Sequence, residues 1–285
     1  MRFESAKNYD EFAVAQKQAA RDLYHALFQY VKRADRIYEI GCGSGIFTHY
    51  LLRHFAFRQL FLNDLYRCPL MERYPSQIGD VCEQEIPSNL DLVVSSSVFQ
   101  WIIPLEELFK KIAAALKQNG FFAFSMFVAG TLWELESFTH QGLPYKTPQQ
   151  IKEILFRHFD IVEWKENFCT LSFPDCFALL HSLKQTGVNN LQGDFRLTKT
   201  SYRKLDESFD ENVKIPKTSI SFVIYTYYRS FKDKKSTSKL TEFVKKFINE
   251  YDSNEEYKVS LQDGTSSSES VKARLQYWRN IIREL

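Results

Sequence analysis

Three glycines alternate with other residues in "IYEIGCGSGIFTHYL", residues 37–51. Apolar residues before them predict a buried strand over 36–40, and the residues after them predict a helix that runs to about residue 55. Gly41, Gly43 and Gly45 therefore form a tight turn between a strand and a helix. A turn of this kind leaves bare backbone N–H groups at a helix N-terminus, facing a ligand above the strand end. That ligand could be a dinucleotide, a phosphate or another molecule.

The spacing of the glycines and one nearby carboxylate distinguish among these ligands. A dinucleotide fingerprint has its third glycine three residues after the second, whereas here the distance is two and residue 46 is Ile. Glu39, at the end of the strand, would repel a pyrophosphate and attract a cation. S-adenosylmethionine carries a sulfonium and an ammonium but no phosphate. We therefore expect Glu39 and the three glycines to hold its amino-acid half.

Two further carboxylates follow predicted strands. Asp64 ends the strand "RQLFLND" at residues 58–64, where doubly wound folds place the carboxylate that binds ribose hydroxyls. Asp80 follows a brief predicted strand near Gln77 and Ile78, where it could meet an adenine amino group. Each carboxylate alone could be a solvated loop residue or a helix cap. Three of them in register with strand ends favour a cofactor site.

Strands and helices alternate along the first part of the chain. Helices are predicted over 10–31, 69–74 and 104–120, the last with Pro104 at its start and Gly120 just past its end, and strands over 90–97 and 121–127. This rhythm predicts an α/β fold with a parallel sheet covered by helices on both faces. Later segments are predicted as helix over 131–138, 147–159 and 174–187, and as strand over 160–173 and 217–230.

Composition limits the possible functions. The chain has 285 residues, 44% of them hydrophobic, and a formal charge of +2, so it gives no general reason to expect nucleic acid. Its start lacks the apolar core of a secretory signal, and no apolar run is long enough for a membrane span. Five scattered cysteines without a C-x-x-C pair predict free thiols and a cytoplasmic location. The six histidines lack metal-ligand spacing, so no metal site is expected.

Several segments resemble one family of enzymes. "SSSVFQW" (95–101), "FSMFVAGTLWEL" (124–135) and "HSLKQTGVNNL" (181–191) are similar to the malonyl-acyl carrier protein O-methyltransferases of biotin synthesis, as are "FESAKNYDEFAVAQ" and "PKTSISFVIYTYY". The resemblance covers about residues 3–230. It implies a Rossmann-like class I methyltransferase fold with a mostly parallel seven-stranded sheet and a helical lid insertion at about 174–214. The methyltransferase domain is then 1–230, and 231–285 is a polar helical appendage.

The resemblance implies that S-adenosylmethionine methylates the free carboxylate of malonyl-acyl carrier protein, giving the methyl ester that primes pimeloyl synthesis for biotin. Many members have Ser-Asn where this chain has Ser95-Ser96, which puts any contact of that asparagine in doubt. Gln16 in the opening helix is expected to close over the cofactor. The expected cofactor-binding residues are Gln16, Glu39, Gly41, Cys42, Gly43, Gly45, Asp64, Leu65, Asp80, Val81 and Ser95.

The chemistry needs little from the protein. A malonyl carboxylate has a pKa of about 4 and is already ionised at neutral pH, so no general base is required. A tight cationic clamp on the attacking oxygen would stabilise the ground state more than the charge-depleted transition state. We therefore expect hydroxyls, an amide or an indole near that oxygen. The candidates are Tyr9, Gln100 and Trp101, with Tyr145 and Lys146 farther out.

Acyl carrier proteins are strongly acidic, so basic residues near the pocket mouth would steer docking. Four such residues fall in the predicted lid: Lys184, Lys199, Arg203 and Lys204. Two alternatives stay open. One is a methyltransferase that acts on malonyl-coenzyme A or another small carboxylic acid, and the other is a methyltransferase fold that has lost activity and serves as a binding module.

Overall fold

The structure is a computed structural model that describes residues 9–132, 135–136, 139–140, 142–171, 173–186, 198–208 and 215–226. The chain divides into two compact units, Met1–Tyr227 and Tyr228–Leu285. The second unit, and with it the predicted appendage 231–285, lies outside the described residues.

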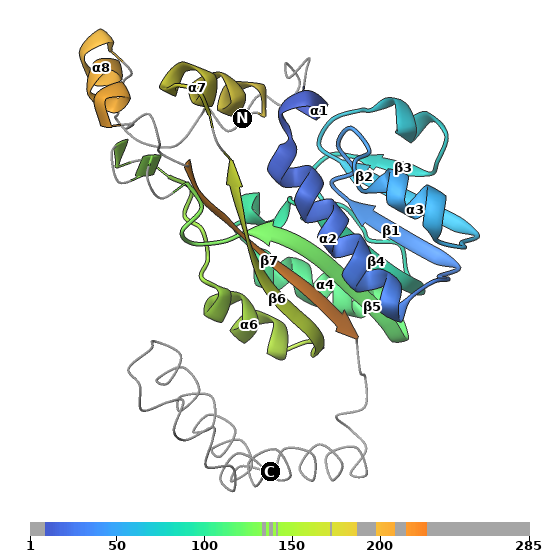
Figure 1. Cartoon of the computed structure of the whole chain (residues 1–285). Coiled ribbons are helices and arrows are strands. Elements are labelled where there is room, and N and C mark those ends of the chain that lie inside the picture. Colours follow the sequence, from blue (N-terminus) through green and yellow to red (C-terminus); the bar gives the residue numbers. More distant parts are fainter. Residues whose placement is uncertain are drawn as a thin grey trace, which may run out of the picture. The chain divides into compact units, whose positions relative to one another are not determined.

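A single seven-stranded sheet forms the centre of this unit (Figure 1). Its strands lie in the order β3-β2-β1-β4-β5-β7-β6. Neighbours from β3 to β5 pair in parallel, whereas β7 is antiparallel to both β5 and β6. The predicted mostly parallel seven-stranded sheet is therefore confirmed. The strands are β1 (Arg36–Ile40), β2 (Gln59–Asp64), β3 (Ser76–Ile78), β4 (Leu90–Ser96), β5 (Leu116–Phe127), β6 (Asp160–Leu171) and β7 (Ile215–Thr226).

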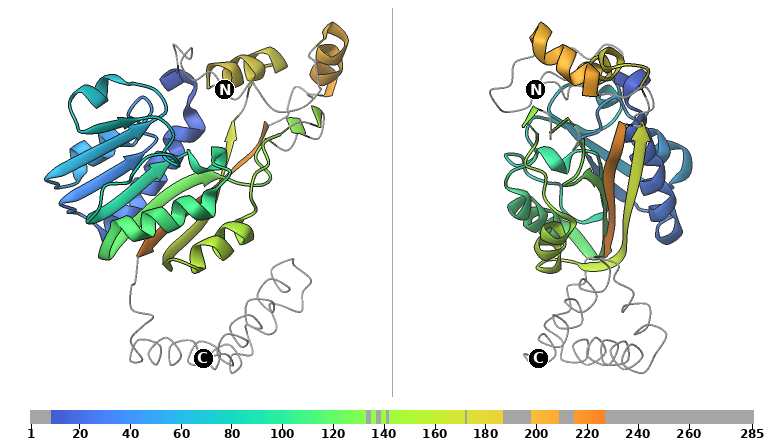
Figure 2. Two further views of the ribbon diagram at one scale, coloured as in Figure 1. Left: turned by 180° about the vertical axis from the view of Figure 1, so that it is seen from behind. Right: turned by 60° about the vertical axis from the view of Figure 1, so that its left-hand side comes forward.

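Helices cover both faces of the sheet because both faces are apolar. On one face α2 (Val14–Tyr30) and α3 (Thr48–His54) pack with Ile37 and Leu62 in one core cluster. On the other face α4 (Leu105–Ala115) and α6 (Pro148–Phe156) pack with Tyr38, Phe122 and Phe124 in a second cluster. Figure 2, right, shows these helices on opposite sides of the sheet. Because Ile37 and Tyr38 are neighbours, they point to opposite faces, as alternation along a strand requires.

The predicted helix over 104–120 is wrong after residue 115. Helix α4 ends at Ala115, and Leu116 already has an extended backbone and pairs with Leu90 of β4. The register then shifts, with Asn119 at φ +62°, before Phe121 pairs with Leu92. Lys117 Nζ reaches Asp91 Oδ1 of β4 at 2.7 Å. Pairing with β4 thus overrides the helix propensity of these residues.

The predicted helix over 10–31 is interrupted. A short helix, α1 (Tyr9–Phe12), is separated from α2 by Ala13, which leaves the helical region at φ −76° and ψ 48°. Phe12 then contacts His181 edge-on, with ring centroids 5.3 Å apart. This break aims α1 at the segment after β6 instead of along the sheet.

The segment after β6 contains two described helices, α7 (Cys176–Gln185) and α8 (Lys199–Ser208). Asp175 caps α7 by accepting from the backbone N–H of Ala178 at 2.7 Å, as expected of an N-cap aspartate. Figure 1 places α1 and α7 at the same end of the sheet. These two helices lie within the predicted lid, 174–214, while residues 187–197 and 209–214 lie outside the described residues, as does part of the helix predicted over 131–138.

Candidate functional site

A large cavity of about 600 Å³ lies at the carboxyl ends of the parallel strands. Open α/β sheets bind their ligands in such a crevice, beside the strand where the order reverses, which here is β1 between β2 and β4. Two short 3-10 helices, η2 (Pro69–Glu72) and η3 (Phe99–Trp101), help to frame it. Its lining includes Tyr9, Gly41, Gly43, Ser44, Asn63, Asp64, Leu65, Asp80, Val81, Ser96, Ser97, Val98 and Trp101.

The N–H groups of the glycine turn are mostly bonded within the protein. Gly41 and Cys42 both donate to the Asn63 carbonyl, at 2.8 and 3.0 Å, and Gly45 donates to the Cys42 carbonyl at 2.8 Å. Gly43 donates to Asp64 Oδ2 at 2.8 Å. The expectation that this turn leaves bare donors is therefore wrong for these four residues. The turn offers a phosphate little, which agrees with a ligand that has none.

Gly41 forms a cradle that a larger residue would fill. A Cβ at this position would lie 2.2 Å from Cγ2 of Val98, and the backbone has φ +71°, which L side chains rarely adopt. Val98 is β-branched and stiff about χ1, so it cannot yield simply by changing the rotamer of a long side chain. The glycine turn is thereby packed directly against the segment that follows β4.

Glu39 is a buried carboxylate with an unsatisfied oxygen. Its side chain is 1% exposed, and Oε2 has no hydrogen-bond partner among the described residues. Burial raises its pKa to about 8, the charge of Asp64 adds to the rise, and the hydroxyl of Thr48 opposes it. A cation delivered to this end of β1 would offset the cost of ionising Glu39, as the ammonium of S-adenosylmethionine would.

Asp64 and Asp80 both line the cavity. Asp64 is tied to the glycine turn through Gly43 and accepts from Tyr66 N at 3.1 Å through Oδ1. Burial raises its pKa, while these backbone N–H groups lower it. Asp80 Oδ1 accepts from Cys82 N at 2.8 Å. Each carboxylate is thus held by backbone donors and still faces the cavity, as a ribose or an adenine amino group would require.

The remaining predicted cofactor residues divide into two groups. Leu65 and Val81 line the cavity, whereas Gln16 lines the neighbouring one. Glu39, Cys42, Gly45 and Ser95 line neither cavity. Ser95 is buried and donates to the Ile40 carbonyl at 2.9 Å, and the sulfur of Cys42 lies 3.8 Å from that of Cys68.

Sequence reasoning did not find Asn63. The residue is 3% exposed, and its side-chain amide donates to the Gln77 and Gly79 carbonyls at 3.2 and 3.1 Å. Its backbone carbonyl accepts the hydrogen bonds from Gly41 N and Cys42 N of the glycine turn. Asn63 therefore joins the ends of β1, β2 and β3. A polar amide next to Asp64 in an apolar strand was the available signal.

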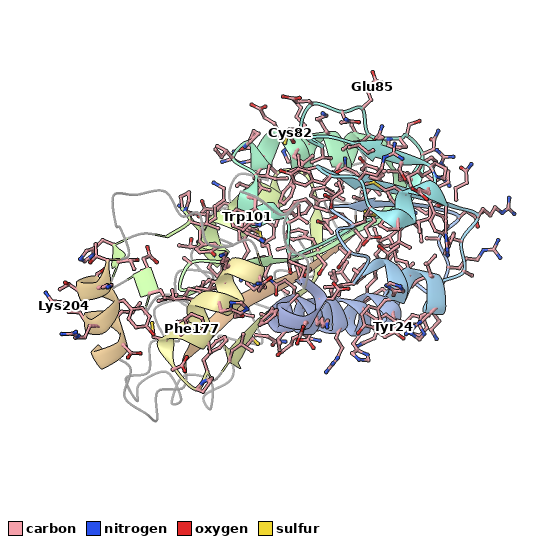
Figure 3. All side chains as sticks on the ribbon, turned by 90° about the horizontal axis from the view of Figure 1, so that it is seen from above. Tyr24, Cys82, Glu85, Trp101, Phe177 and Lys204 are labelled. Atoms are coloured by element: carbon pink, nitrogen blue, oxygen red, sulfur yellow. The ribbon has the colours of Figure 1, made fainter. Side chains whose placement is uncertain are left out.

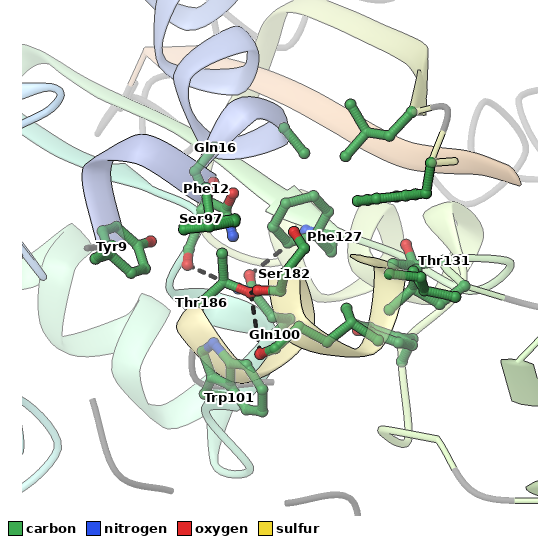
Figure 4. A pocket seen from close by; sticks show the side chains of 17 residues that line it. Tyr9, Phe12, Gln16, Ser97, Gln100, Trp101, Phe127, Thr131, Ser182 and Thr186 are labelled. Carbon is green, nitrogen blue, oxygen red and sulfur yellow. Dashed lines mark hydrogen bonds between the residues drawn. The ribbon is translucent and has the colours of Figure 1, made fainter. Parts of the chain in front are cut away.

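A second cavity of about 90 Å³ adjoins the first and shares Tyr9, Ser97 and Trp101 with it (Figure 4). No Asp, Glu, Lys or Arg is among the described residues that line it. Hydroxyls, amides and apolar side chains surround a small volume instead. Besides the three shared residues, its lining includes Phe12, Gln16, Gln100, Phe127, Thr131, Tyr145, Phe173, Leu179, Ser182 and Thr186.

Of the five residues predicted to contact the carboxylate that accepts the methyl group, four line this smaller cavity and Lys146 does not. Burial raises the pKa of both Tyr9 and Tyr145, so their phenols stay protonated donors. The Gln100 amide is engaged at both ends, because Nε2 donates to the Ser97 carbonyl at 2.7 Å and Oε1 accepts from Phe127 N at 3.4 Å. It braces the loop between β4 and β5 and has less freedom to bind a substrate than predicted.

The predicted docking residues lie on the lid helices. Lys184 on α7 and Lys199, Arg203 and Lys204 on α8 are all exposed, and none of them lines the two cavities just described. Figure 3 shows Lys204 on α8 and Phe177, which is 66% exposed, on α7. Within the described ranges, no group of three or more His, Cys, Asp or Glu could hold a metal ion, and no helix is long and apolar enough to cross a membrane.

Comparisons with known proteins agree with this geometry. A methyltransferase-domain family model matches residues 12–161. The fold is similar to a putative methyltransferase from Bacillus halodurans, with a TM-score of 0.56, 10% identity and coverage of 74% of this chain and 99% of that one. The predicted methyltransferase fold is therefore confirmed.

Relatives in sequence are more specific. The chain is 34% identical over 222 residues to a malonyl-[acyl-carrier protein] O-methyltransferase of Chlorobium phaeovibrioides, which covers 73% of this chain and 85% of that protein. It is 35% identical over 208 residues to the protein of the same name from Bacteroides thetaiotaomicron, at 69% and 79% coverage. The fold, the two adjoining cavities and these relatives lead to one conclusion. The chain belongs to the malonyl-[acyl-carrier protein] O-methyltransferase family.

Proposed function

We propose that this protein transfers a methyl group from S-adenosylmethionine to the free carboxylate of malonyl-acyl carrier protein, giving the malonyl methyl ester that primes pimeloyl synthesis for biotin. The observation that carries the proposal is the meeting of two unlike cavities at Tyr9, Ser97 and Trp101, one with carboxylates and one without charge. The names of the relatives support the same reaction.

The larger cavity is the site for the cofactor, which when bound supplies a methyl group on a positively charged sulfur. Glu39, directly before the cavity-lining Ile40 and Gly41, would meet its ammonium, because a cation there would offset the cost of ionising this buried carboxyl group. Asp64 would accept from ribose hydroxyls, and Asp80 from the adenine amino group. Both retain acceptor capacity beyond the backbone N–H groups that hold them.

The smaller cavity is the site for the malonyl carboxylate. Methyl transfer to a carboxylate cancels two charges, so it is favoured where water and fixed charges are excluded. Neutral donors such as the Tyr9 and Tyr145 phenols can orient the carboxylate without the ground-state stabilisation that a lysine would cause. Alignment of the two ligands across the shared residues would then provide much of the acceleration.

The carrier protein would dock on the lid. Helices α7 and α8 carry exposed positive charge at Lys184, Lys199, Arg203 and Lys204. Helix α7 also contributes Leu179 to the smaller cavity, called the acceptor cavity from here on. An acidic carrier protein on these helices would be attracted by that charge. We further propose a cytoplasmic location, which is supported by five free thiols, and we propose that residues 1–230 carry the activity while 231–285 are an appendage.

Intact-protein mass spectrometry of malonyl-acyl carrier protein, incubated with this protein and S-adenosylmethionine, tests the proposal. Malonic acid and malonyl-coenzyme A serve as competing acceptors. A carrier protein heavier by one methylene, formed much faster than either small ester, is the expected result. Faster methylation of malonyl-coenzyme A would instead support the small-acceptor alternative. No methylation of any acceptor, despite measurable cofactor binding, would contradict the proposed function.

A further inference from the structure

We propose that the Ser97 hydroxyl is a further hydrogen-bond donor that orients the acceptor carboxylate for methyl transfer. This inference rests on the proposed function and adds a substrate-contacting residue to it. Ser97 lies where the two cavities meet, and only Tyr9 and Trp101 of the described residues share that position. Figure 4 shows Ser97 between Tyr9 and Phe127.

The hydroxyl itself is buried and unsatisfied. Oγ of Ser97 is shielded from solvent and has no hydrogen-bond partner among the described residues. A buried hydroxyl without a partner costs free energy, so its retention indicates a ligand that completes the bond. Neighbouring hydroxyls in the same cavity are already engaged, since Thr131 Oγ1 donates to the Val128 carbonyl at 2.7 Å and Thr186 Oγ1 to the Ser182 carbonyl at 3.1 Å.

The backbone at Ser97 is strained in a way that glycine would relieve. Its φ is +60°, in the left-handed region, which costs a residue with a Cβ about 1–2 kcal/mol. Two of the other residues with positive φ are Asn89 and Asn119, a type that tolerates this region well. A serine at a position where glycine would be easier points to a use for its side chain.

Hydrogen bonds of the Ser97 backbone and the packing of the next residue fix this conformation. Ser97 N donates to the Ser125 carbonyl of β5 at 2.9 Å, and the Ser97 carbonyl accepts from Gln100 Nε2 at 2.7 Å. The next residue, Val98, packs into the space that Gly41 leaves open. The hydroxyl is therefore held at a set position relative to both the glycine turn and the acceptor cavity, as alignment of two ligands requires.

The chemical role is positioning without proton transfer. One carboxylate oxygen attacks the methyl carbon, the carbon–sulfur bond breaks, and its electron pair stays on sulfur, giving S-adenosylhomocysteine and a methyl ester. Ser97 donates to the other oxygen, which becomes the ester carbonyl oxygen and can keep the same hydrogen bond. The serine proton stays on Oγ throughout, and no base or further reactant is needed.

The test compares Ser97→Ala and Ser97→Gly with the wild-type protein and with Ser125→Ala. Ser97→Ala removes the hydroxyl and keeps the Cβ, whereas Ser97→Gly also relieves the backbone, so a folding defect would affect the two differently. Ser125 lines neither cavity, and its buried hydroxyl is bonded to Ser96 Oγ at 3.1 Å, which makes it the matched control for a lost serine nearby.

Two readouts separate orientation of the carboxylate from general damage. The first is kcat/KM with malonyl-acyl carrier protein, for which both Ser97 variants should lose about 10- to 100-fold, while the Kd of S-adenosylmethionine changes less than about twofold. The second is binding of malonyl- against acetyl-acyl carrier protein in the presence of S-adenosylhomocysteine. Only the malonyl group has a carboxylate, so the preference for malonyl should fall in both Ser97 variants and stay in Ser125→Ala.

Two outcomes would overturn the inference. Equal losses of cofactor affinity and kcat/KM would assign the hydroxyl to the cofactor, and an unchanged preference for malonyl would remove it from the carboxylate. Failure of the wild-type protein to methylate malonyl-acyl carrier protein is a different result, because it contradicts the proposed function before any variant is compared.

Discussion

The two cavities that meet at Ser97 are built in opposite ways. The larger one, of about 600 Å³, is lined mainly by residues 40–104, at the ends of β1, β2 and β4 and just after β3. It contains two carboxylates held by backbone N–H groups. The smaller one, of about 90 Å³, draws on α1, α2, the ends of β5 and β6, and α7, and the described part of its lining has no charged side chain.

This difference corresponds to the two ligands. A cationic cofactor needs fixed carboxylates, and the ends of parallel strands provide fixed positions for them. A carboxylate that must become a neutral ester needs the opposite, a small site with neutral donors. The carboxylates therefore lie on the cofactor side of the junction and neutral donors lie on the acceptor side. Substitutions on the first side should affect cofactor binding, and substitutions on the second should affect binding and orientation of the methyl acceptor.

The largest effect is expected from Asp64→Ala. This change removes the acceptor for Gly43 N and Tyr66 N and leaves the glycine turn unsupported on one side. The Kd of S-adenosylmethionine should rise on the order of 100-fold, and turnover should be lost with it. Titration calorimetry measures the affinity, and Asp64→Asn, which keeps one acceptor oxygen, should lose less. Unchanged affinity in Asp64→Ala would refute the assignment.

A matched pair of glycines tests the packing between the two sides. Gly41→Ala places a Cβ 2.2 Å from Val98 Cγ2 at φ +71°, whereas Gly43→Ala at φ +53° meets nothing within 4 Å. Gly41→Ala should lower the free energy of unfolding by about 3 kcal/mol, and Gly43→Ala by about 1 kcal/mol. Denaturant unfolding of both proteins measures the difference. Equal losses would mean that Val98 moves away freely.

Gln100→Glu tests the neutrality of the acceptor side. The change places a carboxylate next to the bound carboxylate and removes the donor to the Ser97 carbonyl. KM for malonyl-acyl carrier protein should rise about tenfold or more, with the cofactor Kd nearly unchanged. Gln100→Met, which also loses the donor but adds no charge, is the control in steady-state kinetics. An equal KM in the two variants would argue against charge exclusion.

Glu39 predicts a pH dependence of the cofactor side. Burial raises the pKa of Glu39 from 4.5 to about 8, so between these values the folded protein keeps a proton that the unfolded chain has released. The contribution of Glu39 to the free energy of unfolding therefore falls as pH rises through this range. Because a cationic ligand favours the ionised carboxylate, and the α-amino group of the ligand itself loses its charge at about pH 8, cofactor affinity should rise roughly tenfold from about pH 6 to about pH 7.5.

The control for this pH dependence is Glu39→Gln, in which the rise in affinity should disappear. Calorimetry at several pH values measures both proteins. The same slope in the variant would assign the titration to another group.

The smallest effect is expected from removal of residues 236–285. If the activity resides in 1–230, methyl transfer in the same mass-spectrometric assay should stay within about twofold of the full chain. Circular dichroism establishes whether the shortened protein is folded. A folded but inactive product would place the tail in the site or in its support.

Much of the cofactor side could be predicted from the sequence because its residues lie at the ends of strands that local patterns reveal. The strand before the glycines, Glu39, Asp64 and Asp80 follow from apolar runs and from the position of polar residues at their ends. The seven-stranded sheet and the lid followed from the family resemblance. What local reading could not foresee was that Asn63 and Asp64 take up the N–H groups of the turn, because hydrogen bonds between strands depend on register.

The acceptor side was decided by tertiary structure. Ala13 breaks the first helix so that Phe12 contacts His181 of α7 and Tyr9 lines both cavities, and pairing with β4 converts the end of a predicted helix into β5. The sequence pointed to Ser95 as a cofactor residue and assigned no role to Ser97, yet the left-handed backbone and unsatisfied hydroxyl of Ser97 set it apart. Sequence alone thus determined which elements form and which carboxylates end them. Long-range packing decided which neutral side chains share a cavity, because residues far apart along the chain meet only in the folded protein.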